Sequence, residues 1–343
     1  MRKVDKNTQD IDFVITWVDG NDLEWKREKA ARLGHTDMDI SVNADGRKER
    51  YRDWDNLRYW FRGMEKYAPW VRKVHFVTWG HIPQWLNTKH PKLNIVCHED
   101  FIPQKFLPTF NSHTIEWNFH RIPGLTEQFV YFNDDMFLID SVRPEDFFKN
   151  GFPCDCCIET ALVQDNIRNP FANILMNDAA LVNMHYNKKE VIKKQANKWF
   201  SPAYGAMLFR NVLMLPYREF SSFKYSHLPS PFLKATYWKV WDEEGAVLDE
   251  VCKNRFRTVF DVNQYVMKYW QYMEGKFTPQ SPKLGRFYTI GKHDQQIHHT
   301  IRRQACKMIC LNDDVNVGDF EKQKKEIQRS FEVIFPEKSS FEM

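Results

Sequence analysis

Glycine is scarce in this sequence, and the glycine-rich loops that bind phosphate are absent from it. There are 13 glycines among 343 residues. Neither G-x-G-x-x-G nor G-x-x-x-x-G-K-[ST] occurs. The nearest approach, from Gly285 to Gly291-Lys292, is one residue too long. These absences argue against a dinucleotide-binding fingerprint and against a P-loop.

Long apolar runs and extracellular signatures are also missing. No run reaches the ~20 apolar residues that span a membrane. Residues 1–10 are polar and no apolar segment follows them, so we expect no secretory signal. The 7 cysteines are scattered and no N-x-[ST] sequon occurs. An odd cysteine count without these signatures predicts a reduced, cytoplasmic protein.

One cysteine cluster has a spacing that does not match common zinc sites. Cys154, Cys156 and Cys157 form a C-x-C-C string, and Cys306 and Cys310 lie far downstream. A zinc ribbon or finger needs paired cysteines or histidines at regular spacing. The sequence favours buried, inert thiols and leaves a zinc site as the alternative.

Charge of one sign is not in excess. Lys and Arg number 49 against 45 Asp and Glu, which gives a net charge of +4. No basic stripe is longer than residues 322–325, so we expect no nucleic-acid partner. Hydrophobic residues make up 43% and charged residues 27%, as in soluble globular proteins. The length allows one large domain or two closely packed ones.

The first third alternates apolar, β-branched runs with helical patterns. This alternation predicts an α/β fold with a mostly parallel sheet. The expected strands are residues 11–18, 74–79, 93–97 and 129–132. The expected helices are residues 22–33, with Asp22 as N-cap, and 53–67, with a helical turn at 82–87 and a loop at 34–50.

The second half reads as mainly helical. Its clearest helices are residues 187–198, 231–244 and 262–274. We therefore divide the chain into an α/β half at 10–150, a helical half at 151–315 and a charged tail at 316–343. Within that tail, residues 322–329 are read as a solvated helix face, with contact to an anionic membrane surface as the alternative.

Two acidic strings follow predicted strands. Asp19-Gly20-Asn21-Asp22 follows the first strand, and Asn133-Asp134-Asp135 follows the fourth. Ligands of open α/β sheets bind beyond the carboxyl ends of strands. An Asp in the first string suits a uracil edge or a ribose hydroxyl, whereas an ordinary Asp-Gly turn is the alternative. The paired carboxylates suit Mg²⁺ with a nucleotide, whereas a helix N-cap is the alternative.

Other polar groups are candidates for chemistry. Glu116 and His120 are spaced i, i+4, so they are expected on one helix face, with an ordinary ion-paired helix as the alternative. His227 lies in a Tyr-Ser-His-Leu-Pro string and is either structural or catalytic. Arg257 suits a phosphate or a surface ion pair. The string Cys-Leu-Asn-Asp-Asp at 310–314 could bring a further amide or carboxylate to the same site.

Taken together, these strings resemble the four conserved blocks of the Stealth protein family. Blocks one and two are the long and specific ones. The matching segments are 11–22 for block one; 50–59, 68–72, 77–86, 107–110, Glu116, 120–121 and 131–135 for block two; 226–229 and 255–257 for block three; and 310–314 for block four.

The resemblance implies a fold and a function. The family includes bacterial capsular polysaccharide phosphotransferases and the catalytic subunit of the animal N-acetylglucosamine-1-phosphotransferase. The implied fold is α/β, a glycosyltransferase-A-like (Rossmann-like), mostly parallel sheet with a helical second half. The implied reaction moves a hexose-1-phosphate, such as N-acetylglucosamine-1-phosphate, from a UDP-sugar to an oligosaccharide or polysaccharide hydroxyl and releases UMP. The compact length favours the bacterial form, with peripheral contact to the inner face of the membrane as an open question.

The resemblance also implies roles for particular residues. Family functional positions fall on Glu116, Asp135, His227 and Arg257. In the predicted mechanism His227 is the first choice of general base and Glu116 the second. Arg257 neutralises the transferred phosphoryl group. Mg²⁺ or Mn²⁺ is held by Asp135 with Asp134 or Asn312, and the nucleotide by Asp19, Gly20, Asn21 and Arg58.

Two other functions use the same residues differently. A metal-dependent glycosyltransferase would use the same sheet and acids, but it would attack the anomeric carbon and release UDP. A polysaccharide-binding protein without catalysis would need neither metal nor nucleotide. Residue spacing does not separate the two transferases, so the choice of phosphoryl transfer depends on the family resemblance.

Overall fold

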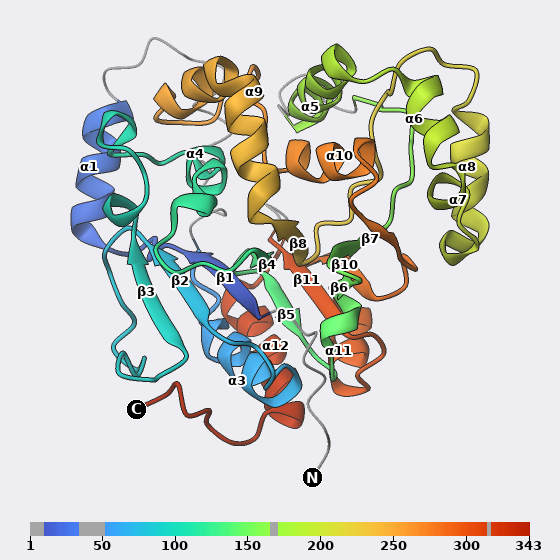
Figure 1. The fold of residues 1–343 in the computed structure, drawn as a ribbon. Coiled ribbons are helices and arrows are strands. Elements are labelled where there is room, and N and C mark those ends of the chain that lie inside the picture. The colour runs from blue at the N-terminus through green and yellow to red at the C-terminus, as the bar shows by residue number, and fades with distance from the viewer. Residues whose placement is uncertain (1–9, 34–51, 165–170, 314–316) are drawn as a thin grey trace.

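A computed structural model describes residues 10–33, 52–164, 171–313 and 317–343 (Figure 1). The loop expected at 34–50 lies outside the described residues. At the start of the chain, strand β1 (Ile11–Trp17) leads into helix α1 (Leu23–Leu33). The Asp22 side chain accepts a hydrogen bond from the Trp25 amide at 2.7 Å, so the predicted N-cap is confirmed.

The main sheet has five strands in the order β3-β2-β1-β4-β8. The first four are parallel to one another and are β1, β2 (Val74–Thr78), β3 (Leu93–Cys97) and β4 (Gln128–Phe132). Strand β8 (Ser230–Leu233) runs antiparallel to β4. The predicted α/β fold with a mostly parallel sheet is therefore confirmed, and all four predicted strands are present.

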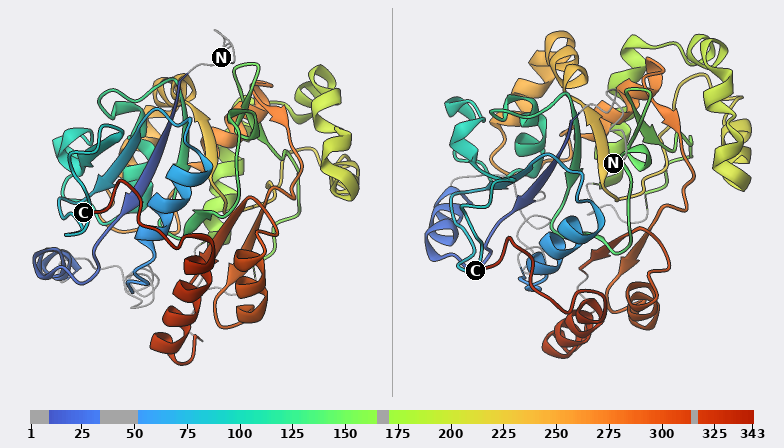
Figure 2. Two further views of the ribbon diagram at one scale, coloured as in Figure 1. Left: turned by 90° about the horizontal axis from the view of Figure 1, so that it is seen from below. Right: turned by 60° about the horizontal axis from the view of Figure 1, so that its bottom comes forward.

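Helices cover both faces of this sheet, as the views in Figures 1 and 2 show. Alternate residues of β1 point to opposite cores, with Phe13 in one and Val14 in the other. The first core includes α3 (Leu57–Tyr67), α11 (Asp294–Arg302) and α12 (Phe320–Ile334). The second includes α4 (Ser112–Trp117), α5 (Phe171–His185), α9 (Lys234–Lys253) and α10 (Tyr265–Met273).

The remaining elements are short. Two small sheets have the orders β10-β11-β5 and β6-β7-β9. Their strands are β5 (Met136–Leu138), β6 (Phe148–Lys149), β7 (Phe152–Asp155), β9 (Thr278–Pro279), β10 (Gly285–Thr289) and β11 (Met308–Asn312). The short α-helices are α6 (Lys188–Lys194), α7 (Ala196–Trp199) and α8 (Leu208–Leu213). The 3₁₀ turns are His98–Asp100, Gln104–Phe106, Phe119–Arg121, Pro144–Asp146 and Pro202–Met207.

Three local predictions need correction. Residues 231–244 were expected to be one helix, but the first three belong to strand β8, where Gln128 to Val130 of β4 pair with them. Residues 82–87 form turns and an isolated bridge from Leu86 to Glu342 rather than a helical turn. Residues 187–198 contain α6 and α7, separated at Gln195.

The two halves of the chain share their sheets. Strand β8 from the second half completes the main sheet, and β11 from the C-terminal region pairs with β5. The segment expected to be a charged tail contains α12. Its Ile327, Phe331 and Ile334 are buried in the first core, while Lys322 and Lys325 are exposed. Among the described residues, no helix is long and apolar enough to span a membrane.

A charged cluster lies where β1 begins. Asp12 is fully buried and accepts hydrogen bonds from Arg72 (2.8 and 2.5 Å), from His75 Nε2 (2.9 Å) and from the Thr126 amide (3.0 Å). Burial alone would raise the pKa of Asp12, but hydrogen bonds from His75 and Arg72 outweigh it, and the pKa is lowered. Three segments of chain are thereby joined around one ionised carboxylate.

Candidate active site

The strand order indicates where a ligand binds. The chain proceeds from β1 outward to β2 and β3, then returns to the other side of β1 with β4. The order therefore reverses between β1 and β4, and ligands of such sheets bind beyond the carboxyl ends at this point. Asp19 follows β1 there, and Asn133, Asp134 and Asp135 follow β4.

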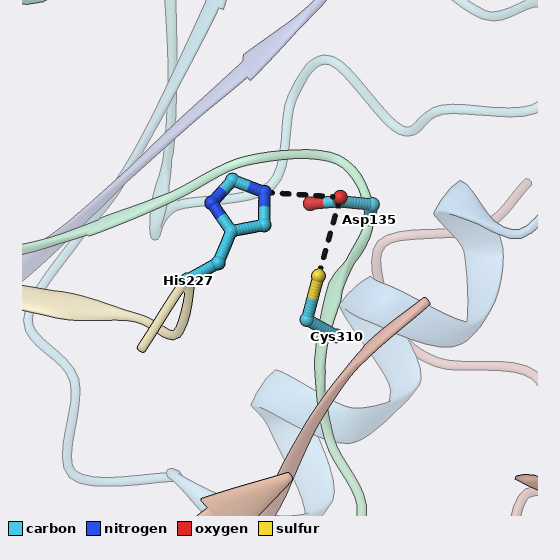
Figure 3. Close-up of side chains that lie close together, drawn as sticks. All are labelled: Asp135, His227 and Cys310. Atoms are coloured by element: carbon cyan, nitrogen blue, oxygen red, sulfur yellow. Dashed lines mark hydrogen bonds and ion pairs between the residues drawn. The ribbon is translucent and has the colours of Figure 1, made fainter. Parts of the chain in front are cut away.

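Asp135, His227 and Cys310 meet at this edge of the sheet (Figure 3). His227 Nε2 lies 3.3 Å from Asp135 Oδ2, and the Cys310 thiol lies 3.2 Å from the same oxygen. Their ligand atoms all lie within 4.8 Å of one another, and these three form the one such group of His, Cys, Asp and Glu found among the described residues. Residues from three distant parts of the sequence thus converge on one carboxylate.

Strand pairing brings His227 to Asp135. Strands β4 and β8 are antiparallel, with Tyr131 opposite Ser230. The chain before β8 therefore runs beside the chain after β4, which places His227 next to the paired aspartates. His227 has a φ of 35°, in the left-handed region that a non-glycine residue adopts only when its surroundings hold it there.

Cys310 is brought to the site by the small sheet β10-β11-β5. Strand β11 is antiparallel to β5, with Cys310 opposite Met136, and the Leu311 amide donates to the Asp135 carbonyl at 2.9 Å. On the other side of β11, a Cβ on Gly285 would lie 2.8 Å from the Leu228 side chain and 2.6 Å from Met308. Gly285 therefore lets β10 approach the loop that carries His227.

Two atoms of this group have no hydrogen-bond partner. Asp135 Oδ1 and His227 Nδ1 are both buried and unpartnered within the described part of the chain. Buried polar atoms are rarely left without a partner, so these two suit a ligand or ion. Burial, and next the charge of Asp135, raises the pKa of the Cys310 thiol well above its ordinary value. The thiol therefore stays protonated and donates a hydrogen bond to Asp135.

These residues fit a divalent cation held through Asp135. Carboxylate oxygen is the ligand that Mg²⁺ and Mn²⁺ prefer, and Asp135 Oδ1 is available for it. Imidazole and thiol suit softer metals better, so His227 and Cys310 fit roles as partners of the second oxygen, Oδ2. Such partners orient a ligating carboxylate.

The other predicted metal ligands lie near but outside the convergent group. Asp134 is exposed at the end of β4, next to Asp135. Its pKa is raised to about 7, first by desolvation and then by the charges of Asp135 and Asp53. Asn312 ends β11 and its side-chain amide donates to the Asp313 carbonyl at 2.9 Å. Asp313 in turn accepts hydrogen bonds from Arg52 and Trp54.

Glu116 belongs to a second group at the ends of β1 and β4. It is buried on α4, and Tyr131 donates its hydroxyl hydrogen to Glu116 Oε1 at 3.2 Å. The same hydroxyl lies 3.3 Å from Thr16 and contacts the Asn133 side chain. Burial, then the charge of Glu116, raises the pKa of Tyr131 well above its ordinary value, so this hydroxyl stays protonated.

Glu116 and His120 do not share a helix face, contrary to the prediction. Helix α4 ends at Trp117, and residues 119–121 form a 3₁₀ turn that reorients the next side chain. His120 is buried against the aromatic rings of α9, with its ring centroid 4.3 Å from that of Trp238. Burial lowers the pKa of His120 to about 3, which makes it a neutral core residue.

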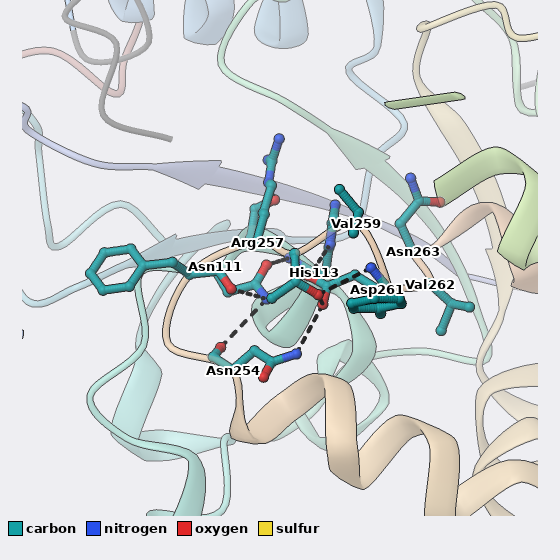
Figure 4. Close-up of polar contacts among 12 residues, drawn as sticks. Asn111, His113, Asn254, Arg257, Val259, Asp261, Val262 and Asn263 are labelled. Carbon is teal, nitrogen blue, oxygen red and sulfur yellow. Dashed lines mark hydrogen bonds and ion pairs between the residues drawn. The ribbon is translucent and has the colours of Figure 1, made fainter. Parts of the chain in front are cut away.

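A polar network anchors the loop that carries Arg257 to the start of α4 (Figure 4). Its guanidinium contacts the Ser112 hydroxyl at the start of α4. The loop that carries Arg257 is fixed by Asp261, which accepts hydrogen bonds from Asn111 (2.9 Å), His113 (3.0 Å), Asn254 (3.0 Å) and Thr258 (2.8 Å). Burial lowers the pKa of His113, so its ring is neutral and donates to Asp261.

The predicted nucleotide-binding residues lie in two places. Asp19 forms a turn in which its carboxylate accepts from the Asn21 amide at 2.8 Å, and its own amide donates to His81 at 2.7 Å. Asn21 is exposed and Gly20 is buried in this turn at the end of β1. Arg58 is on α3, with its guanidinium 5.2 Å from the centre of the Trp85 ring. The turn is thus at the expected edge of the sheet, and Arg58 stacks on an aromatic ring.

Sequence reasoning missed three features of the site. Tyr131 and the thiol of Cys310 were not assigned roles, although each contacts a predicted site residue. A pocket beside His227 is lined by Lys224, Tyr225, Ser226, Leu228, Pro282, Gly285 and Phe287. Phe287 is exposed, and its ring centroid lies 5.9 Å from that of His227. Only their position in the folded chain relates these residues to the site.

The cysteine string at 154–157 is not part of the metal-ligating group found among the described residues. Cys154 and Cys157 are buried, and burial raises the pKa of Cys154 and Cys156 to about 12. All 7 cysteines are free thiols. The choice between inert thiols and a zinc site therefore stays a prediction for this cluster, whereas Cys310 contacts Asp135.

Sequence comparisons match three conserved regions of one family. Conserved region 1 of the Stealth proteins matches residues 9–37, conserved region 2 matches 50–154 and conserved region 4 matches 299–343. The last match includes α12, which therefore belongs to the conserved part of the chain.

Curated relatives align over nearly the whole chain. The capsular polysaccharide phosphotransferase WcwK of Streptococcus pneumoniae is 38% identical over 98% of this chain and 99% of its own. The receptor polysaccharide phosphotransferase WefC of Streptococcus oralis is 37% identical over 97% and 99%. The exopolysaccharide phosphotransferase cps2G of Lactiplantibacillus plantarum is 36% identical over 97% and 96%.

Similarity to solved structures is weaker. The galactosyltransferase LgtC, solved with donor and acceptor sugar analogues, aligns with a TM-score of 0.36 and 10% identity over 93% of this chain and 95% of that one. The bifunctional glycosyltransferase WbbM aligns with a TM-score of 0.37 and 11% identity over 94% and 51%. These scores are low, and the fold class is assigned from the strand order given above.

Proposed function

The chain belongs to the Stealth family, and from that membership we propose that it transfers a sugar-1-phosphate from a UDP-sugar to a sugar hydroxyl in the synthesis of a cell-surface polysaccharide. Capsular and exopolysaccharide phosphotransferases that align over nearly its full length support this class of reaction. The proposed donor is UDP-N-acetylglucosamine, the acceptor is an oligosaccharide or polysaccharide, and UMP is the leaving group. The free state of the cysteines fits a cytoplasmic enzyme.

One observation carries the proposal: Asp135 and His227 meet at the switch point of the sheet, and each has a buried atom without a hydrogen-bond partner in the described chain. If His227 donates its Nε2 hydrogen to Asp135, Nδ1 is left as a base. Asp135 Oδ1 is left at the same time for a cation. A carboxylate that orients an imidazole is a common arrangement for general base catalysis.

The proposed reaction breaks one P–O bond and forms another. The acceptor hydroxyl oxygen bonds to the β-phosphorus of the UDP-sugar, and its proton moves to His227 Nδ1. The bond between the β-phosphorus and the bridging oxygen breaks, and UMP leaves with that electron pair. The anomeric C–O bond is untouched, so the product is a phosphodiester that keeps the donor's anomeric configuration.

The remaining site residues are proposed to position the reacting groups and to neutralise the charge of the phosphates. Arg257, held by Ser112, would pair with the transferred phosphoryl group, because guanidinium suits phosphate oxygens. Glu116 is the alternative base, and its bond from Tyr131 holds it at the ends of β1 and β4. A divalent cation held by Asp135, with Asp134 beside it, would supply charge neutralisation at the diphosphate.

The pocket beside His227 suits the acceptor sugar. Phe287 offers an exposed ring next to His227, and the Lys224 side chain lines the same pocket. Aromatic rings in carbohydrate sites provide apolar contact for sugar faces. The turn at Asp19, Gly20 and Asn21 is the proposed seat of the uridine.

The nucleotide product tests the proposal. Purified protein would be incubated with UDP-N-acetylglucosamine, Mn²⁺ or Mg²⁺ and short capsular oligosaccharides, and UMP and UDP would be resolved by anion exchange. UMP together with a new phosphodiester is the expected result. UDP as the product would instead establish glycosyl transfer at the anomeric carbon. Asp242→Asn, which changes an exposed aspartate on α9, is the matched control for Asp135→Asn.

A further inference from the structure

Helix α8 and the turn after it expose an unusual amount of apolar surface. Phe209, Val212, Leu213, Leu215 and Tyr217 are each between 42% and 72% exposed, and all lie within nine consecutive residues. Single exposed apolar side chains are ordinary, whereas a contiguous group marks an interaction surface. We call these five residues the α8 patch.

The packing of α8 against the core does not explain why the side chains of the α8 patch are exposed. Phe209, Val212 and Leu213 have the spacing i, i+3, i+4, so they share one helix face, and that face is the exposed one. The inward side is anchored by Asn211, whose amide donates to the Cys157 and Trp199 carbonyls at 2.9 and 2.7 Å. The helix therefore buries an asparagine and exposes its large apolar side chains, the reverse of what folding alone favours.

Basic side chains outnumber acidic ones on the α8 patch segment and on the neighbouring helix α6. Exposed basic side chains on α6 and on the patch segment are Lys189, Lys193, Lys194, Arg210 and Arg218. The acidic residues of the same stretch, 186–219, are Glu190 and Glu219. Lys188 fixes α6 against the end of α8, because its ammonium donates to the Met214 carbonyl at 2.7 Å. The cations and the apolar side chains thus belong to one connected lobe.

This lobe stands at the margin of the molecule. In the views of Figures 1 and 2, α7 and α8 lie on the outer side, away from the five-stranded sheet. A second copy of the chain is a poor partner, because a two-fold contact would bring the same five cations together. A flat anionic surface accepts both the protruding apolar side chains and the cations around them.

We propose that the α8 patch docks the protein on the surface of an anionic lipid bilayer, with Phe209 and Leu213 inserted at the level of the headgroups and the basic side chains paired with lipid phosphates. The docking surface is therefore on α8 rather than on the lysine-rich face of α12. The proposal does not depend on the transfer reaction.

Vesicle cosedimentation of the full chain tests it. Wild-type protein is expected to bind vesicles of phosphatidylcholine mixed with phosphatidylglycerol, to bind pure phosphatidylcholine far less, and to be released by high salt. The variant Phe209→Asp/Leu213→Asp should lose at least about tenfold in its partition coefficient for each side chain. Far-UV circular dichroism would show that this variant is folded, and Phe209→Ser/Leu213→Ser repeats the test without adding charge.

A matched control changes two exposed apolar residues elsewhere. Leu23→Asp/Val333→Asp alters the net charge by the same amount on α1 and α12 and should bind vesicles as the wild type does. Failure of the wild type to bind anionic vesicles would overturn the proposal. So would equal loss of binding in the control, or a dimer in sedimentation velocity that the α8 substitutions dissociate while vesicle binding is absent.

Discussion

Two aspartates near the strands β1 and β4 have opposite environments. Asp12, in the first strand, has hydrogen-bond partners for both oxygens from Arg72, His75 and Thr126. Asp135, after the fourth strand, shares one oxygen between His227 and Cys310, and its other oxygen has no partner in the described chain. Both sites need an ionised carboxylate. The fold supplies hydrogen-bond partners to both oxygens of Asp12, but in the described chain to one oxygen of Asp135.

The difference distinguishes a carboxylate whose partners the fold supplies from one that we propose binds a cation. A buried carboxylate whose partners are all supplied by the fold contributes to stability and has no capacity left for a ligand. A half-buried carboxylate such as Asp135, with one buried and unpaired oxygen, carries an unfavourable desolvation energy that a bound cation would offset. The comparison predicts that substitution of Asp12 reduces stability and substitution of Asp135 reduces turnover.

The largest expected effect is on turnover at Asp135. Asp135→Asn should lower kcat by on the order of 10³-fold, because the proposed cation and His227 both depend on its charge. Its unfolding midpoint should change little, because few bonds to Asp135 support the fold. Steady-state kinetics and urea denaturation of Asp135→Asn and Asp242→Asn would be compared. A variant that keeps most of its turnover contradicts the assignment.

The next effect is on stability at Asp12. Asp12→Asn should lower the free energy of unfolding by about 3 kcal/mol, because Arg72 and His75 lose their ionised partner while Arg72 keeps some contact with solvent. The kcat of the folded variant should match that of the wild type. A loss of kcat comparable to that of Asp135→Asn would break the distinction between the two sites.

The lowered pKa of Asp12 also predicts how the free energy of unfolding changes with pH. The pKa of Asp12 is lowered in the folded chain, so its stabilisation is fully present above the unfolded carboxyl pKa of ~4. As the pH falls through the lowered pKa, that stabilisation is lost. The difference in unfolding free energy between wild type and Asp12→Asn should therefore narrow below about pH 4. A constant difference from pH 7 to pH 3 would contradict this account.

A smaller effect is expected from added metal. Mn²⁺ at about ten times its Kd should stabilise the wild-type fold by ~1.4 kcal/mol. Thermal unfolding should show the same shift in Asp12→Asn and none in Asp135→Asn. An equal shift in all three proteins would place the metal elsewhere.

The smallest expected effect concerns the thiol at Asp135. Cys310→Ser keeps a hydrogen-bond donor to the carboxylate and should retain kcat within about threefold, whereas Cys310→Ala should lose about fivefold. Kinetics at saturating Mn²⁺ would compare the two. If both variants lose more than a hundredfold, Cys310 has a direct role in the chemistry that a hydrogen-bond donor does not explain.

Local patterns predicted the strand ends well. Apolar runs located β1 and β4, and the polar strings after them located Asp19 and Asp135 at the carboxyl ends of these strands. Both signals are contained in a few consecutive residues. Glu116, His227 and Arg257 were candidates from their residue types, and the family resemblance then implied functional roles for them. The structure places Glu116 and His227 near the same strand ends.

Local sequence patterns did not predict which distant segments pair with one another. Pro231 and the following apolar residues suggested the start of a helix, but β4 recruits them as β8 and thereby sets His227 beside Asp135. Cys310 is brought to the same carboxylate by the pairing of β11 with β5. Each contact depends on which strands meet in space, a choice made by the packing of the whole sheet.

The most direct test of the central claim follows the β-phosphorus. UDP-N-acetylglucosamine labelled with ³²P at the β-position would be incubated with the protein, Mn²⁺ and capsular oligosaccharides. Our account predicts that the label moves to the oligosaccharide with the sugar while the nucleotide product is unlabelled UMP. Label retained in UDP, with unlabelled sugar attached to the acceptor, would contradict phosphoryl transfer and establish glycosyl transfer.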